Sequence, residues 1–194
     1  MSECVDVDVQ RDAALRKIGR NVVNFQKLEV SLKQILPTLR YAGPLREVQS
    51  LHAANVQKIR KKSLGELANS FHSALYAGKH IVPDPVESTE ITITHSFHTE
   101  LNSTEVAETK KALIRLVRER NLLIHFELAS IDFSSIPACG ELSVRLDEQN
   151  ERICVQLNHL QALRQTHSEI LIVLKNFIGS DEFLELISRD SDES

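Results

Sequence analysis

Residues 115–128, RLVRERNLLIHFEL, place side chains capable of acid–base and phosphate chemistry in a segment otherwise rich in Leu, Ile and Val. At about 100° of rotation per residue, Arg118, Asn121 and His125 lie close to one face of a helix. Burying such a row without partners would be unfavourable, so the pattern favours a face that meets water, a polar groove or a ligand. An imidazole can exchange a proton near neutral pH, and a guanidinium can bind phosphate oxygens.

Arg120 lies away from this face. It precedes His125 by five residues, which places it roughly 140° away on an ideal helix. The two side chains can converge only through the length of the Arg side chain, a local break in the helix, or a second copy of the same segment. We therefore expect a dimer. The simpler alternative is that Arg120 forms a cap or a salt bridge and that His125 is a hydrogen-bonded interior histidine.

Residues 120–125, Arg-Asn-Leu-Leu-Ile-His, resemble the R-N-x-x-x-H motif of HEPN domains, which occur in prokaryotic toxin–antitoxin, phage-defence and other RNA-cutting systems. The segments IGRNVVNFQKLEVSLKQIL and IPACGELSVRLDEQNERI also resemble a HEPN-like domain that bacterial proteins carry beside an OST-HTH (LOTUS) RNA-binding module. The chain departs from that second pattern in having no room for such a module.

The resemblance implies a metal-independent RNA endonuclease without a cofactor, in which Arg120, Asn121 and His125 are the catalytic residues. In HEPN dimers two motifs face each other, and the products would carry a 2′,3′-cyclic phosphate and a 5′-hydroxyl. The implied partners are single-stranded RNA, a second copy of the chain, and an antitoxin or other regulatory protein. A hypothesis of a different class is a catalytically inactive HEPN-like dimerisation or adaptor module that binds a protein or RNA.

The charge pattern offers a second contact for RNA. The formal net charge is −4, so no overall basic field attracts nucleic acid. The basic run KIRKK, with Lys58, Arg60, Lys61 and Lys62, could join Arg118 in contacting phosphates independently of sequence. The alternative for KIRKK, which we favour, is that it is a solvated helix end whose positive charges complement the helix dipole and do not bind RNA. Aromatic residues are only 5% of the chain and Trp is absent, so we do not expect bases to stack on aromatic platforms.

Other site types are not indicated. The strand-like ITITHSF places His95 and His98 on opposite faces, and no spacing of Cys or carboxylates, nor His72 or His80, completes a metal site. Three cysteines without a CxxC indicate a reducing compartment. With no signal peptide or membrane span, we expect a cytoplasmic protein that does not bind membranes.

The hydrophobic pattern predicts a mainly α fold, an antiparallel HEPN-like bundle. Apolar residues spaced three and four apart predict helices over 10–36, from about 45, 64–78, 103–130 and from about 139 to 178. The linker TLRYAGP (38–44) joins the first two, and the helix over 64–78 should bury Leu64, Leu67, Phe71 and Leu75. Ser63 and Glu66 predict a capping box, and Ser103 or Thr104 a second cap. The alternating segment predicts a small β-hairpin near residues 80–99, in which it pairs with residues near 80–83.

The last helix carries the longest apolar stripe, which indicates burial across the whole bundle or a seam with a second chain. We expect one domain over residues 8–179. Residues 180–194 would form a short acidic extension, in which Ser180 caps a helix over DEFLELI and the tail RDSDES is disordered.

Overall fold

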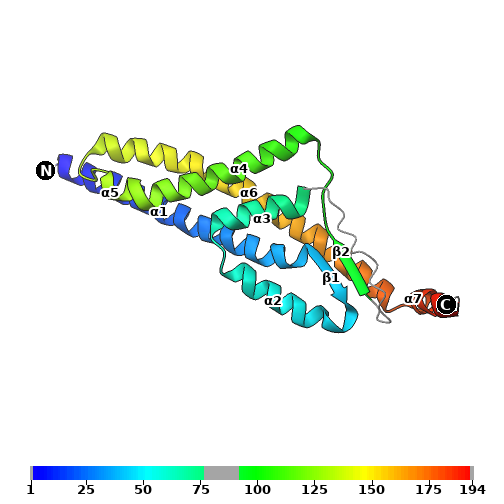
Figure 1. Cartoon of the computed structure of the whole chain (residues 1–194). Helices are drawn as coiled ribbons and strands as arrows, with labels where there is room; N and C mark the ends of the chain where they lie inside the picture. The colour runs from blue at the N-terminus through cyan, green and yellow to red at the C-terminus, as the bar shows by residue number, and fades with distance from the viewer. Residues whose placement is uncertain (1, 77–91, 193–194) are drawn as a thin grey trace. The chain divides into compact units, whose positions relative to one another are not determined.

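The computed structural model describes residues 2–76 and 92–192 (Figure 1). The chain divides into two compact units, Met1–Asn158 and His159–Ser194. The boundary lies within the last long helix, and the two predicted segments, 8–179 and 180–194, stay a prediction. The mainly α fold, a two-stranded antiparallel sheet and a long C-terminal helix are confirmed.

The first unit holds most of the elements. Its helices are α1 (Ser2–Ile35), α2 (Val48–Arg60), α3 (Leu64–Tyr76), α4 (Ser103–Leu122) and α5 (Leu128–Ser130). Short 3₁₀ helices, η1 (Leu36–Thr38) and η2 (Leu45–Glu47), flank the strand β1 (Arg40–Pro44), and β2 (Thr92–Ser96) precedes α4. A π-helical segment, η3 (Leu123–Glu127), joins α4 to α5. The helix α6 (Ile136–Ile178) continues into the second unit, which also holds α7 (Asp181–Asp192).

The strand β2 pairs with a different partner from the predicted one. Residues 80–83 lie outside the described residues, whereas β2 pairs antiparallel with β1, Arg40 opposite Ser96 and Pro44 opposite Thr92. The predicted linker over 38–44 therefore contains a strand. Gly43 and Pro44 are unfavourable inside strands, and a pairing between strands so distant in sequence leaves no local pattern. Within β2 the alternation is confirmed: Ile93 and His95 are half-buried, whereas Thr92, Thr94 and Ser96 are exposed.

Local hydrogen bonds explain where the helices begin. The backbone N–H of Ser63 donates to the Glu66 carboxylate over 2.8 Å, and the N–H of Glu66 donates to the Ser63 hydroxyl over 3.4 Å, so the predicted capping box is confirmed. The Ser63 hydrogen bonds lower the pKa of Glu66. The predicted cap of α4 was wrong, because Asn102 accepts from the N–H of Glu105 over 2.9 Å. Asn is as effective as Ser at this position, and Glu105 completes the box.

Two boundaries near the C-terminus also differ from expectation. The long helix α6 begins at Ile136, before the expected start at Cys139. Ser180 caps α7 as predicted, since its hydroxyl accepts from the N–H of Phe183 over 3.3 Å. The part of the tail that the structure describes is helical, because the helix that begins at this cap continues to Asp192.

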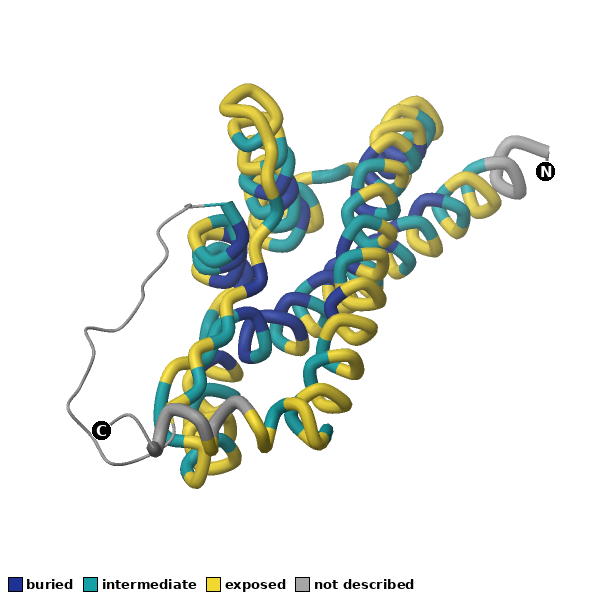
Figure 2. Tube along the Cα trace, turned by 90° about the vertical axis from the view of Figure 1, so that its right-hand side faces the viewer, coloured by how far each residue is buried: buried dark blue, intermediate teal, exposed yellow. Residues whose placement is uncertain are grey.

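The long helices of the first unit bury residues on one side and expose the other, whereas short α5 buries none (Figure 2). The helix α3 packs against both α1 and α4 (Figure 1). The predicted core face of α3, with Leu64, Leu67, Phe71 and Leu75, is confirmed as buried. The same core contains buried side chains from other elements of this unit: Leu28, Leu32, Ile35, Leu39, Leu113, Leu116, Leu123, Leu142, Leu146 and Ile153.

A polar seam joins α1 to α6 within the first unit. Asn21 is fully buried, and its amide nitrogen donates to the carbonyl of Leu146 over 2.7 Å and to Oε1 of Gln149 over 2.9 Å. At the edge of the seam, Lys17 and Arg20 bind opposite oxygens of the Asp147 carboxylate, at 2.6 Å and 3.0 Å. Because a buried amide is favourable only when it is hydrogen-bonded, this set of contacts selects one register of α1 against α6.

Replacing Asn21 by Ala should destabilise the first unit by about 2 kcal/mol, because Oε1 of buried Gln149 loses its donor and the Leu146 carbonyl keeps only the side-chain contact with Arg20 at 3.1 Å. Asn24→Ala is the matched control, since half-buried Asn24 makes one hydrogen bond, to Asn150 over 2.8 Å, and its loss should cost about 0.5–1 kcal/mol. Denaturant unfolding of both variants gives the two values. Equal losses would show that the Asn21 contacts do not set the register.

Candidate functional site

The motif predicted from sequence lies on one continuous helical segment. The helix α4 carries Arg118, Arg120 and Asn121, and η3 carries His125. Arg118, Asn121 and His125 are exposed and Arg120 is half-buried. His125 makes no hydrogen bond or ion pair within the described part of the chain. The alternative of an interior, hydrogen-bonded histidine is therefore wrong.

The segment departs from α-helical geometry over Leu123–Glu127, across the end of the motif. The backbone N–H of Leu128 donates to the carbonyl of Leu123, five residues earlier. In an α-helix the N–H would instead donate to the carbonyl four residues earlier. The turn in η3 therefore holds more residues, and residues five apart within it are separated by a smaller rotation about the helix axis. The wider turn begins at Leu123, so it removes part of the rotation that separates Arg120 from His125. Single π turns inside α-helices occur frequently at functional sites.

Arginines from outside the motif neutralise the carboxylates beside it. Glu119, with 18% of its side chain exposed, accepts from Arg115 over 2.7 Å and from Arg152 of α6 over 3.1 Å. Glu127 binds Arg145 of α6 at 2.8 Å. Both carboxylates flank the motif, and neither is ion-paired with a residue of the motif.

Arg118 and Arg120 consequently have no carboxylate partner among the described residues. Arg120 donates from Nη1 to Oδ1 of Asn121 over 3.1 Å, which fixes the guanidinium next to the amide. Arg118 makes no hydrogen bond or ion pair there. A guanidinium already paired with a carboxylate would have to break that pair to bind a phosphate. These two do not, so the motif face, formed by Arg118, Asn121 and His125, can accept an anion directly, with the Arg120 guanidinium held at its edge by Asn121.

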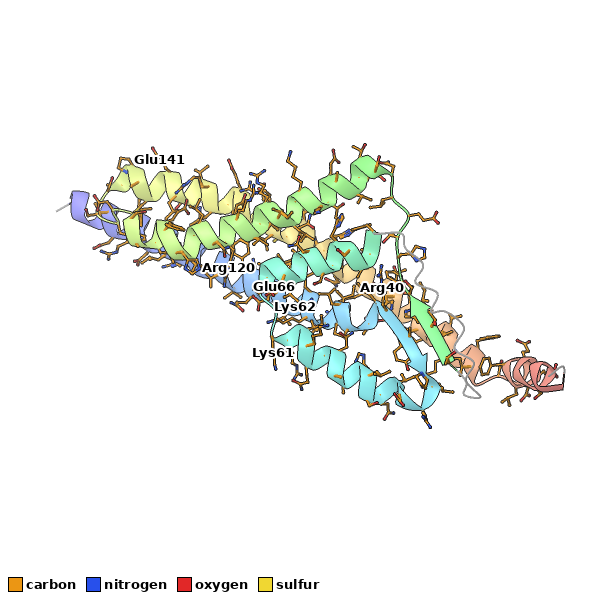
Figure 3. The ribbon with its side chains drawn as sticks, viewed as in Figure 1. Arg40, Lys61, Lys62, Glu66, Arg120 and Glu141 are labelled. Carbon is orange, nitrogen blue, oxygen red and sulfur yellow. The ribbon has the colours of Figure 1, made fainter. Side chains whose placement is uncertain are left out.

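The predicted basic run lies near the same part of α4. Lys58 and Arg60 end α2, Lys61 follows, and all three are exposed. Lys62 differs from them, because its ammonium donates to the hydroxyl of Ser70 over 2.6 Å. Figure 3 labels Lys61 and Lys62 at the turn between α2 and α3, and Arg120 on α4.

Close packing of α3 on α4 connects this turn to the motif. At Gly65, in the first turn of α3, an added Cβ would lie 3.5 Å from the Cγ1 of Val117. Val117 precedes Asn121 by one helical turn. The structure thus brings the end of the basic run and the start of the motif face to neighbouring parts of two packed helices.

A groove of about 460 Å³ lies between α4 and α6 on the first unit. Leu116 and Val155 contribute apolar surface to it, and Glu108, Lys111, Glu151 and the paired Arg115 and Arg152 contribute charges of both signs. Because its arginines are occupied by Glu119 and acidic side chains stand beside them, this groove is a poorer site for an anion than the motif face.

Other candidate sites find no support in the described residues. No group of three or more His, Cys, Asp or Glu within 2–76 and 92–192 is placed to hold a metal ion. His95 is half-buried, which lowers its pKa, His98 is exposed, and His80 lies outside the described residues. Cys139 and Cys154 are free thiols. None of the described helices combines the length and the apolar character that crossing a membrane requires.

No protein-family model matches the chain, and searches of curated proteins and of solved structures find no match. The geometry of the motif face and its surroundings therefore carries the functional argument.

Sequence reasoning missed three features of the site. A π turn has no recognisable residue pattern, and the pairing of Glu119 and Glu127 with α6 depends on contacts between distant segments. The third feature is that the apolar run around the motif is not uniformly buried. Leu123 is fully buried, whereas Leu122 is 50% and Phe126 64% exposed. Leu122 and Phe126 are four residues apart and therefore share one side of the helix, and this spacing was the signal that could have identified the stripe.

Proposed function

We propose that the chain is a metal-independent RNA endonuclease that acts as a homodimer. The observation that carries the proposal is an exposed imidazole in a π turn, on one segment with two arginines that have no carboxylate partner among the described residues. The R-N-x-x-x-H resemblance supports the same reaction class. Such an enzyme would suit the toxic or effector half of a bacterial defence or toxin–antitoxin system, with an antitoxin or regulatory protein as its partner.

The reaction needs only groups that RNA and these side chains supply. The 2′-oxygen forms a bond to phosphorus as the bond from phosphorus to the 5′-oxygen breaks, leaving a 2′,3′-cyclic phosphate and a 5′-hydroxyl. One proton leaves the 2′-hydroxyl and another reaches the departing 5′-oxygen. His125 carries out one of these transfers. Arg120 stabilises the charge that develops on the phosphoryl oxygens, and Asn121 holds the guanidinium in place.

Basic side chains that are not paired with a carboxylate would position the RNA. Arg118, Lys58, Arg60 and Lys61 make no ion pair among the described residues, so they can contact phosphates without regard to base sequence. Lys62 contributes less, because it already donates to Ser70. Single-stranded RNA is the substrate that can follow such a surface, because its backbone bends.

A second copy completes the chemistry. One imidazole cannot be both the base for the 2′-hydroxyl and the acid for the 5′-oxygen in a single step, whereas two facing motifs supply both. Size-exclusion chromatography with light scattering should therefore give twice the mass of one chain. A strictly monomeric protein that still cleaves RNA would contradict the composite site.

An exposed apolar surface on the second unit favours a different function, a catalytically inactive adaptor module. Ile170, Ile172 and Val173 of α6 are 43%, 59% and 69% exposed, which is unusual for aliphatic side chains so close together. In that case the chain would bind a protein partner through this surface and would not cleave RNA.

Cleavage of single-stranded RNA in excess EDTA distinguishes the two functions. We expect the wild-type chain to cleave, and His125→Ala and Arg120→Ala to lower kcat/KM by ~100-fold or more, because each removes a group that acts in the transition state. Gel analysis with end-group mapping should show the cyclic phosphate.

Arg115→Ala is the matched control, since it removes an arginine of the same helix that is already paired with Glu119. We expect its kcat/KM to stay within ~3-fold of wild type, with circular dichroism confirming the fold of all variants. The adaptor function predicts no cleavage by any of them, and cleavage that survives His125→Ala would contradict the proposed mechanism.

A further inference from the structure

An apolar stripe runs beside the polar row of the motif. Leu122 and Phe126 are four residues apart and are 50% and 64% exposed, and each follows directly after a residue of the row, Asn121 or His125. Because residues four apart are neighbours on a helical surface, the two side chains form one shelf alongside the Asn121–His125 row. We call Leu122 and Phe126 the apolar shelf.

The Phe126 ring is available for stacking. Among the described residues, the other large exposed aromatic side chain is Phe177, which is 41% exposed and already in edge contact with Phe183. Phe126 makes no ring contact within that part of the chain. Isolated exposed hydrophobic residues are common. What distinguishes Phe126 is its place in the π turn, directly after His125.

We propose that the apolar shelf is the base subsite of the endonuclease, with the base beside the scissile phosphate stacked on the Phe126 ring and flanked by Leu122. This inference rests on the proposed function. An RNA strand has a charged sugar–phosphate side and an apolar base side. In the proposed complex the polar row of Arg118, Asn121 and His125 faces the sugar–phosphate backbone, and the apolar shelf faces the bases. The low aromatic content of the chain argues against a platform of several rings, whereas this subsite needs a single ring. Stacking is sequence-tolerant because every base has a flat apolar face.

The size of the shelf favours a base over a second protein chain. Two side chains offer far less than the roughly 800 Å² per partner of a stable protein interface, whereas one base needs only one ring. Charged groups also bound the shelf. The ion pairs of Glu119 with Arg152 and of Glu127 with Arg145 lie within one turn of it along the chain, so a larger apolar contact would have to cover them.

The absence of Trp from the chain makes a direct test possible. Phe126→Trp places a single indole in the shelf, and Val23→Trp places one at a comparably exposed position of α1, 52% exposed. Each variant is titrated with a single-stranded 2′-O-methyl RNA, which cannot be cleaved, while the polarisation of a labelled copy reports binding. We expect the emission of Phe126→Trp to be quenched in step with binding, and that of Val23→Trp to stay unchanged. Unchanged emission of Phe126→Trp at saturation would overturn the subsite.

Cleavage kinetics provide the second readout. Phe126→Ala and Phe126→Leu should raise KM by roughly tenfold, the factor expected from losing one base stack, with kcat within ~3-fold of wild type. On RNA with an abasic nucleotide next to the cleavage site, all forms should share the same raised KM. An unchanged KM in both variants would refute the subsite. So would a dimer-to-monomer shift of Phe126→Ala in light scattering, because a second copy would then cover the shelf.

The two proposals fail in different ways. If His125→Ala abolishes cleavage but Phe126→Ala leaves KM unchanged, the endonuclease stands and the base subsite falls. If the wild-type chain cleaves nothing, the endonuclease falls. The quenching experiment, which needs no catalysis, then still decides whether the shelf binds RNA bases.

Discussion

The site depends on the hydrogen bonds of buried Asn21, which set the register of α1 against α6. The amide of Asn21 fixes Leu146 and Gln149 opposite α1. The neighbouring turns of α6 then place Arg145 and Arg152 beside the α4–η3 segment. There they bind Glu127 and Glu119. A shift of α6 by one residue would turn these arginines by about 100° and release both carboxylates beside the motif. The polar seam thus keeps the charge of Arg118 and Arg120 available.

The π turn has a complementary role. Regular α-helical geometry would hold Arg120 and His125 on different sides of the segment, and η3 reduces that separation while keeping the helix continuous. Within η3, Leu123 stays in the core and Phe126 is exposed, next to exposed Leu122 at the end of α4. The π turn therefore carries both the exposed imidazole of His125 and the aromatic ring of the apolar shelf, while the core holds the helix on its buried side.

Features of the fold that depend on short stretches of sequence could be predicted. The capping box at Ser63, the buried face of α3 and the alternation in β2 follow from spacing and residue type, and all are confirmed. The pairing of β2 with β1 could not be predicted, because the partner lies far away in the sequence and contains Gly43 and Pro44. The same limit applies to the site. The polar row was visible at 118–125, whereas the pairing of Glu119 and Glu127 with α6 appears only once the helices are packed.

The proposed activity requires above all that a phosphodiester binds to the exposed face of α4 and η3. Titration of the ¹⁵N-labelled chain with a short single-stranded 2′-O-methyl RNA, followed by heteronuclear NMR, tests it directly. We expect the largest amide shifts between Arg118 and Phe126, with smaller ones at Lys58–Lys61 and none along the Val155 groove. Shifts confined to other surfaces, or no shifts at RNA concentrations well above those of the protein, would contradict the account.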